Sequence, residues 1–199
     1  MAVDPNQHDT FVLRQKFAPV VNRYEFSLAE GEPAFCFVEQ KRFTFKEDIR
    51  FFTDESKTTE LMRIKARQRF DPRATYDVTG ADGSKIGEIK KVFGTSLFRS
   101  TYEIDWPGGA VTAQEKNVIV ALFRRLVGLI PYIGDFADWL PIPYHFDFKR
   151  GDQVIATHSR ELWKFRDTYV IDLAGDPQRT LDRRLVLAIA VGMDALQAR

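Results

Sequence analysis

A row of alternating basic residues is the feature of this sequence best suited to binding chemistry. The row consists of Arg63, Lys65, Arg67 and Arg69, and Met62, Ile64 and Ala66 alternate with it. Alternate residues of a strand share one face, so the pattern predicts cations on one side and apolar contacts on the other. Between Leu61 and Ser100 there are nine basic and four acidic residues, and Lys90 and Lys91 are among the nine.

The basic row allows two interpretations. Four cations on the outside of a sheet can hold anionic lipid head groups, each contributing about 1 kcal/mol near such a surface. The alternative is an exposed strand face whose charges keep it soluble and prevent pairing with another sheet. Nucleic acid is not an expected partner, because the chain's 29 basic and 28 acidic side chains nearly cancel and no recognition motif accompanies the row.

A second group of candidates lies in an apolar, proline-rich stretch at 117–143, which interrupts the regular pattern. Arg124 and Arg125 stand among apolar residues, and Trp139 follows them. This combination is typical of an interfacial helix at a membrane. We first expect a lid over one end of the domain, with a membrane contact and a dimer contact as the alternatives.

Catalytic and metal-binding patterns are missing from the sequence. His8, His145, His158 and Cys36 are scattered without the spacing of a zinc site. There is no calcium-binding EF-hand loop and no nucleophile elbow, and the one glycine-rich stretch is followed by a strand pattern. We therefore expect no metal, no cofactor and no enzymatic activity.

The elements that must position these residues are repeated hairpins. Four triplets, each with two apolar residues around a charged one, recur at intervals of 25, 27 and 26 residues: Tyr24-Glu25-Phe26, Ile49-Arg50-Phe51, Tyr76-Asp77-Val78 and Tyr102-Glu103-Ile104. A turn and a return strand follow each of the first three, and Asp82-Gly83 is the clearest turn signal. Repeated antiparallel hairpins of this size predict a meander that closes into a barrel.

The last apolar run, Leu185 to Met193, predicts a helix that is buried on all sides. The run has no polar stripe, so either lipid or the protein must surround it. Nine apolar residues between Arg184 and Asp194 are too few to cross a bilayer, which takes about 20. With Thr180 or Asp182 as the cap, we expect a central helix over 180–196 inside the barrel.

The segment Trp163 to Tyr169, together with Leu185 to Val191, resembles the LURP-one-related family of the tubby C-terminal-like group, which includes the phospholipid scramblases. Lys65 to Gln68, Ala74 to Thr79 and Asp82-Gly83 are similar to bacterial scramblase-like members. The resemblance covers about residues 11–199 and departs from the family over 106–143. It implies a twelve-stranded barrel around a hydrophobic C-terminal helix. Tubby-like members bind phosphoinositides and scramblases move lipids, whereas many LURP-one-related proteins have no known activity.

Our sequence-based expectation is therefore one all-β barrel domain over residues 11–199, preceded by a disordered lead-in at 1–10. We expect a cytoplasmic, non-enzymatic binding module at the periphery of anionic phospholipid or phosphoinositide membrane. The lipid-binding candidates are Arg63, Lys65, Arg67, Arg69, Lys90, Lys91, Arg124, Arg125 and Trp139. One alternative is a protein-interaction scaffold or homodimer that uses 117–143, and another is a scramblase-like protein.

Overall fold

Twelve strands and one long helix make up the described part of the chain. The computed structural model describes residues 3–16, 21–41, 48–67, 75–92, 100–116, 145–161 and 168–197. The elements are η1 (Pro5–Gln7), β1 (Thr10–Lys16), β2 (Val21–Ser27), β3 (Cys36–Lys41), β4 (Asp48–Phe52), β5 (Glu60–Ala66), β6 (Thr75–Gly80), β7 (Lys85–Val92), β8 (Thr101–Trp106), β9 (Gly109–Glu115), β10 (His145–Arg150), β11 (Gln153–Arg160), β12 (Thr168–Asp172) and α3 (Arg183–Gln197).

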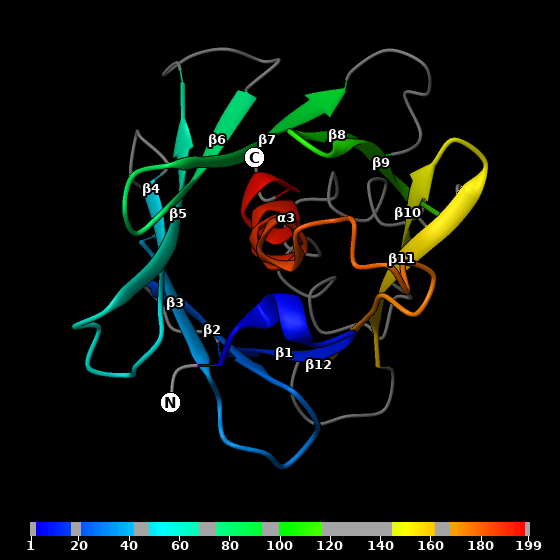
Figure 1. The fold of residues 1–199 in the computed structure, drawn as a ribbon. Helices are drawn as coiled ribbons and strands as arrows, with labels where there is room; N and C mark the ends of the chain where they lie inside the picture. The colour runs from blue at the N-terminus through cyan, green and yellow to red at the C-terminus, as the bar shows by residue number, and fades with distance from the viewer. Residues whose placement is uncertain are drawn as a thin grey trace, which may run out of the picture.

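The strands form a closed antiparallel barrel in sequence order. Each strand pairs with the next along the chain, and β1 pairs with β12 to complete the ring (Figure 1). Phe11 lies opposite Ile171 at this closure. Closure leaves no unpaired sheet edge. The predicted twelve-stranded antiparallel barrel with a C-terminal helix is confirmed.

The repeated triplets are the first strands of four successive hairpins. They lie in β2, β4, β6 and β8, and their apolar residues are at most 7% exposed. The charged residue at the centre of each triplet points the other way, because successive side chains of a strand alternate between faces. Gly83 has a φ of +80° in the turn between β6 and β7, a backbone conformation that favours glycine over other residues.

Helix α3 packs against the inward-facing side chains of the strands in one core cluster. Figure 1 shows it within the ring of strands. The eight apolar side chains between Leu185 and Met193 are at most 1% exposed. Gly87 on β7 allows close packing, since a Cβ atom there would lie 2.9 Å from Cδ2 of Leu185. At the start of the helix, Oδ1 of Asp182 accepts a hydrogen bond from the amide of Arg184, so Asp182 is the predicted cap.

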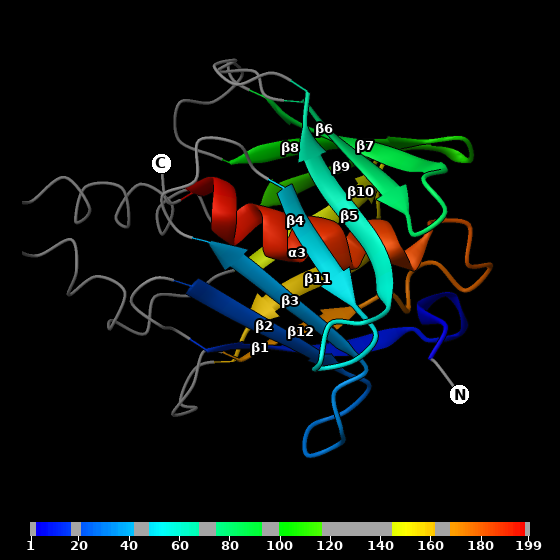
Figure 2. The same cartoon turned by 90° about the vertical axis from the view of Figure 1, so that its left-hand side faces the viewer.

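The two ends of the barrel carry different parts of the chain (Figure 2). One end, here called the capped end, holds η1, the connections 28–35, 53–59, 81–84, 107–108 and 151–152, and the linker 173–182 into α3. At the opposite end, here called the loop end, six connections begin and finish and α3 terminates. These connections are 17–20, 42–47, 67–74, 93–100, 116–144 and 161–167, and most of their residues lie outside the described part.

Two segments outside the repeated hairpins are the N-terminal lead-in and the stretch 117–143. The lead-in at 1–10 was expected to be disordered, but residues 5–7 form η1, Asp4 caps it, and Pro5 is buried. The lead-in pattern misses this because its order depends on contacts with α3, far away in sequence. The stretch 117–143 lies outside the described residues.

Candidate binding surface

The basic row lies on the outer face of β5. Met62 and Ile64 point into the core and are at most 2% exposed, whereas Lys65 and Arg67 are exposed and Arg63 is partly exposed. Strand alternation therefore separates the cations from the core, as the sequence predicts. Arg69 lies outside the described residues.

Arg63 is neutralised by acids on its own and the neighbouring strand. Its Nη2 donates to Oε2 of Glu60 at 3.1 Å, and its Nε lies 3.5 Å from Oδ1 of Asp48. These contacts, led by the hydrogen bond to Glu60, raise the pKa of the Arg63 guanidinium. Much of its positive field is therefore compensated within the protein.

Arg67 is at the centre of a larger ion-pair network. Its Nε and Nη2 donate to the two oxygens of Asp77 at 2.8 and 2.7 Å, and Nη2 also contacts Glu88. Lys85 Nζ lies 2.7 Å from Oε2 of Glu88 and 3.4 Å from Oδ1 of Asp77. The network lowers the pKa of Asp77, chiefly through Arg67, and that of Glu88, chiefly through Lys85.

The network follows from the pairing of the strands. Asp77 lies opposite Glu88, and Glu88 lies opposite Asp105, so three carboxylates cross β6, β7 and β8 side by side. Like charges in directly opposite positions are destabilising. Arg67 and Lys85 relieve that repulsion, so this part of the outer face has mixed charge rather than a single positive sign.

The three candidate lysines have different environments. Lys65 is exposed and has no ion pair within the described residues. Lys90 is exposed and lies 3.6 Å from Glu103. Lys91 shares the inward face with Ile89, because it pairs with Tyr102, whose side chain is fully buried. Adjacent residues of a strand face opposite ways, so Lys90 and Lys91 do not share the outer face.

The remaining candidates, Arg124, Arg125 and Trp139, belong to a loop-end connection outside the described residues. The connections at the two ends of the barrel nevertheless differ strongly in their content of charged and aromatic residues. The loop-end connections contain eleven basic and six acidic residues, with 13 of the chain's 26 aromatic residues. The capped-end connections contain two basic and eight acidic residues and one aromatic residue, Phe35.

Within the described residues, no three His, Cys, Asp or Glu side chains are arranged to hold a metal ion. His145 Nε2 lies 3.0 Å from Oδ1 of Asp147. Cys36 is fully buried, and burial raises the pKa of its thiol, which keeps it protonated. Burial lowers the pKa of His158 to about 3, with a smaller contribution from His145, so its imidazole is neutral.

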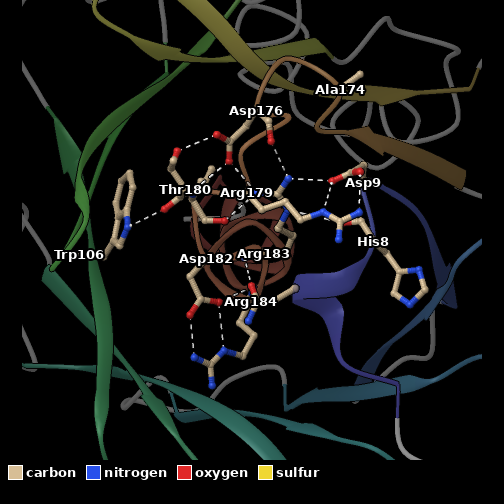
Figure 3. Close-up of polar contacts among 12 residues, drawn as sticks. His8, Asp9, Trp106, Ala174, Asp176, Arg179, Thr180, Asp182, Arg183 and Arg184 are labelled. Atoms are coloured by element: carbon tan, nitrogen blue, oxygen red, sulfur yellow. Dashed lines mark hydrogen bonds and ion pairs between the residues drawn. The ribbon is translucent and has the colours of Figure 1, made fainter.

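Sequence reasoning missed a buried polar cluster at the capped end (Figure 3). Arg183, at the first turn of α3, is 0% exposed, and its guanidinium donates to Oδ2 of Asp176 at 2.6 Å and to Oδ1 of Asp9 at 2.8 Å. Burial alone would raise the pKa of Asp176, but hydrogen bonds from Thr180, the Leu181 amide and Arg183 outweigh it and lower the pKa. The signal was present: an arginine adjoining a fully buried helix needs a carboxylate partner.

The LURP-one-related family model matches residues 35–194. The chain belongs to this family. The matched range begins directly before β3 and ends within α3, so it covers most of the barrel and its helix. Neither the curated proteins nor the solved structures contain a match to the chain. Among the described residues of this family member, no helix is long and apolar enough to span a membrane.

Proposed function

We propose that this LURP-one-related protein is a non-enzymatic binding module that docks on anionic phospholipid membrane with the loop end of its barrel. The observation that carries the proposal is the contrast between the ends. Basic and aromatic residues are concentrated in the connections of one end and acidic residues in those of the other. Basic residues favour anionic membrane surfaces, and aromatic rings favour the headgroup region.

The interior of the barrel supports a role for the outer surface. The side chains of α3 fill the space between the strands, and those from Leu185 to Met193 are almost fully buried. A ligand that enters the centre would have to displace this packing. Binding at an end or on the outer wall leaves the core intact.

The ion pairs of β5 change the roles that we assign to the predicted residues. Arg63 and Arg67 already have carboxylate partners, so we propose that they contribute little to membrane affinity. Arg69, Arg124, Arg125 and Trp139 belong to loop-end connections and are our main candidates. Lys65, which has no ion pair within the described residues, is the best candidate on the strand face.

Co-sedimentation with vesicles tests the proposal. The protein should sediment with phosphatidylserine-containing vesicles at low salt, remain free in high salt, and ignore pure phosphatidylcholine. Reversing two charges in Arg124→Glu/Arg125→Glu should weaken binding by about 30-fold or more, because each lost cation removes about 1 kcal/mol. The control Lys57→Glu/Lys149→Glu has the same net charge but lies toward the capped end, and it should bind more tightly than the loop-end variant.

Two results would change the proposal. An equal loss of vesicle binding in both double variants would mean that the net charge of the protein, rather than the loop end, governs binding. No binding to anionic vesicles at low salt would refute the membrane role. A scaffold or homodimer that uses 117–143 would then be the leading hypothesis, and sedimentation analysis with and without that stretch would test it.

A further inference from the structure

The N-terminal segment lies at the capped end of the barrel, beside the beginning of α3 (Figure 3). Asp4 caps η1, Pro5 is buried within it, and Val3 packs against the core. The backbone carbonyl of Asp9 accepts a hydrogen bond from the Leu173 amide at 2.8 Å, which joins the segment to the linker before α3. Residues 3–9 are called the strap from here on.

The strap supplies groups that the start of α3 needs. The first amides of a helix have no acceptor within the helix. Asn6 Oδ1 accepts a hydrogen bond from the Arg183 amide at 2.8 Å, so a side chain 177 residues away satisfies one of them. The His8 carbonyl accepts a longer hydrogen bond, 3.4 Å, from Nε of Arg183.

The strap also supplies charge. A cation at the N-terminus of a helix is opposed by the helix dipole, and a buried cation needs partners. Arg183 receives one carboxylate, Asp176, from the adjoining linker and another, Asp9, from the strap. Asp9 also pairs with Arg179 in the linker at 3.0 Å. Hydrogen bonds from Arg179 and then Arg183 lower the pKa of Asp9, which keeps it ionised.

We propose that the strap is a conformational lock: its docking holds α3 in the barrel, and its release loosens the helix while the strand pairing persists. The contacts of Asn6 and Asp9 with α3 and its linker are specific to the docked arrangement, so they stabilise strap and helix together. Such coupling is reciprocal. A protein or other ligand that binds residues 3–9 in an undocked form therefore loosens α3, and a change that loosens α3 frees the strap.

Hydrogen exchange of the 199-residue chain and its variants tests the lock. In Asn6→Ala, and more strongly in a variant lacking residues 1–9, amides of α3 should exchange about tenfold faster or more, while β6, β7 and β8 keep their protection. Arg184→Ala is the matched control. Arg184 donates its side-chain hydrogen bonds to Asp182 on its own turn, and only a weaker electrostatic interaction connects it to Asp4 of the strap. Its removal should therefore change α3 exchange less than Asn6→Ala does.

The reciprocal measurement uses a change in the helix alone. Ala188→Gly lowers helix propensity inside α3 without touching the strap, and amides of residues 3–9 should then exchange faster. Unchanged α3 exchange in Asn6→Ala would overturn the lock, as would unchanged strap exchange in a destabilised Ala188→Gly protein. Equal loss of protection in α3 and the strands would also overturn it, because the strap would then stabilise only the whole fold.

Discussion

Arg183 and Arg67 each bridge two carboxylates, yet their surroundings differ completely. Arg183 joins Asp176 and Asp9 with a side chain that is 0% exposed, whereas Arg67 joins Asp77 and Glu88 with a side chain that is 43% exposed. Burial makes the first network costly to break, since any remaining charge is stranded away from water. Water and salt can replace the partners of the second at little cost.

The comparison separates structural charge from surface charge. The Arg183 network connects the N-terminal segment to α3 and belongs to the architecture. The Arg67 network balances carboxylates that strand pairing places next to one another, and its geometry does not require an external anion. Ion-paired arginines therefore stabilise the fold at the capped end of the barrel and offset repulsion between carboxylates on its outer wall.

The variant with the largest expected effect introduces a charge without a partner into the interior. Ala190→Asp places a carboxylate among side chains of α3 that are at most 1% exposed. The cost should be several kcal/mol, because a buried charge without a partner is strongly unfavourable. We expect no soluble folded protein, measured by circular dichroism and gel filtration. Val154→Asp, at a 40% exposed position, is the control and should fold normally.

Removal of Arg183 should have the next largest effect. Arg183→Ala leaves Asp176, which is only 4% exposed, without its cation and should lower the free energy of unfolding by about 3–5 kcal/mol. Urea denaturation measures the change. The double variant Arg183→Met/Asp176→Asn removes both charges and should lose less. If the single and double variants lose the same amount, the ion pair is not the source of the effect.

His158 provides an intermediate test through pH. Its folded-state pKa of about 3 lies below the ordinary 6.5, so the unfolded chain binds the proton first as pH falls. This contribution to stability is therefore complete above about pH 6.5, and about 3 kcal/mol of it is lost as the pH falls toward 4. Urea denaturation at several pH values across this range gives the free energy of unfolding as a function of pH, and this dependence should be weaker in His158→Gln than in the wild type. An equal dependence in both proteins would exclude His158 as the origin.

Arg67→Ala should have the smallest effect. The pair is exposed, so the free energy of unfolding should fall by about 1 kcal/mol or less. Added salt should reduce the difference between variant and wild type. A loss comparable to that of Arg183→Ala would show that exposure does not separate the two networks as we describe.

The barrel could be predicted from sequence because short, local patterns of apolar and polar residues specify its strands and helix. Alternation within triplets such as Tyr24-Glu25-Phe26 specifies which side chains enter the core, and the apolar run after Arg184 specifies a buried helix. The prediction is less informative about charge. Arg67 pairs with Glu88, 21 residues away, and Arg183 with Asp9, 174 residues away.

These pairs depend on strand register and on the path of the strap, neither of which appears in local periodicity. Lys90 and Lys91 illustrate the same limit at short range. Composition counts both as one basic cluster, whereas register places Lys91 on the inward face opposite Tyr102. Sequence charge therefore overestimates the positive field of the outer wall.

The three tryptophans allow the most direct test of the proposed membrane docking. Trp106 lies at the capped end, where its Nε1 donates to the Thr180 carbonyl at 3.2 Å, while Trp139 and Trp163 belong to loop-end connections. Single-tryptophan variants should be mixed with anionic vesicles that contain brominated lipid. We predict fluorescence quenching of the Trp139-only and Trp163-only proteins and none of the Trp106-only protein. Quenching of Trp106 instead, or of none of the three, would contradict docking by the loop end.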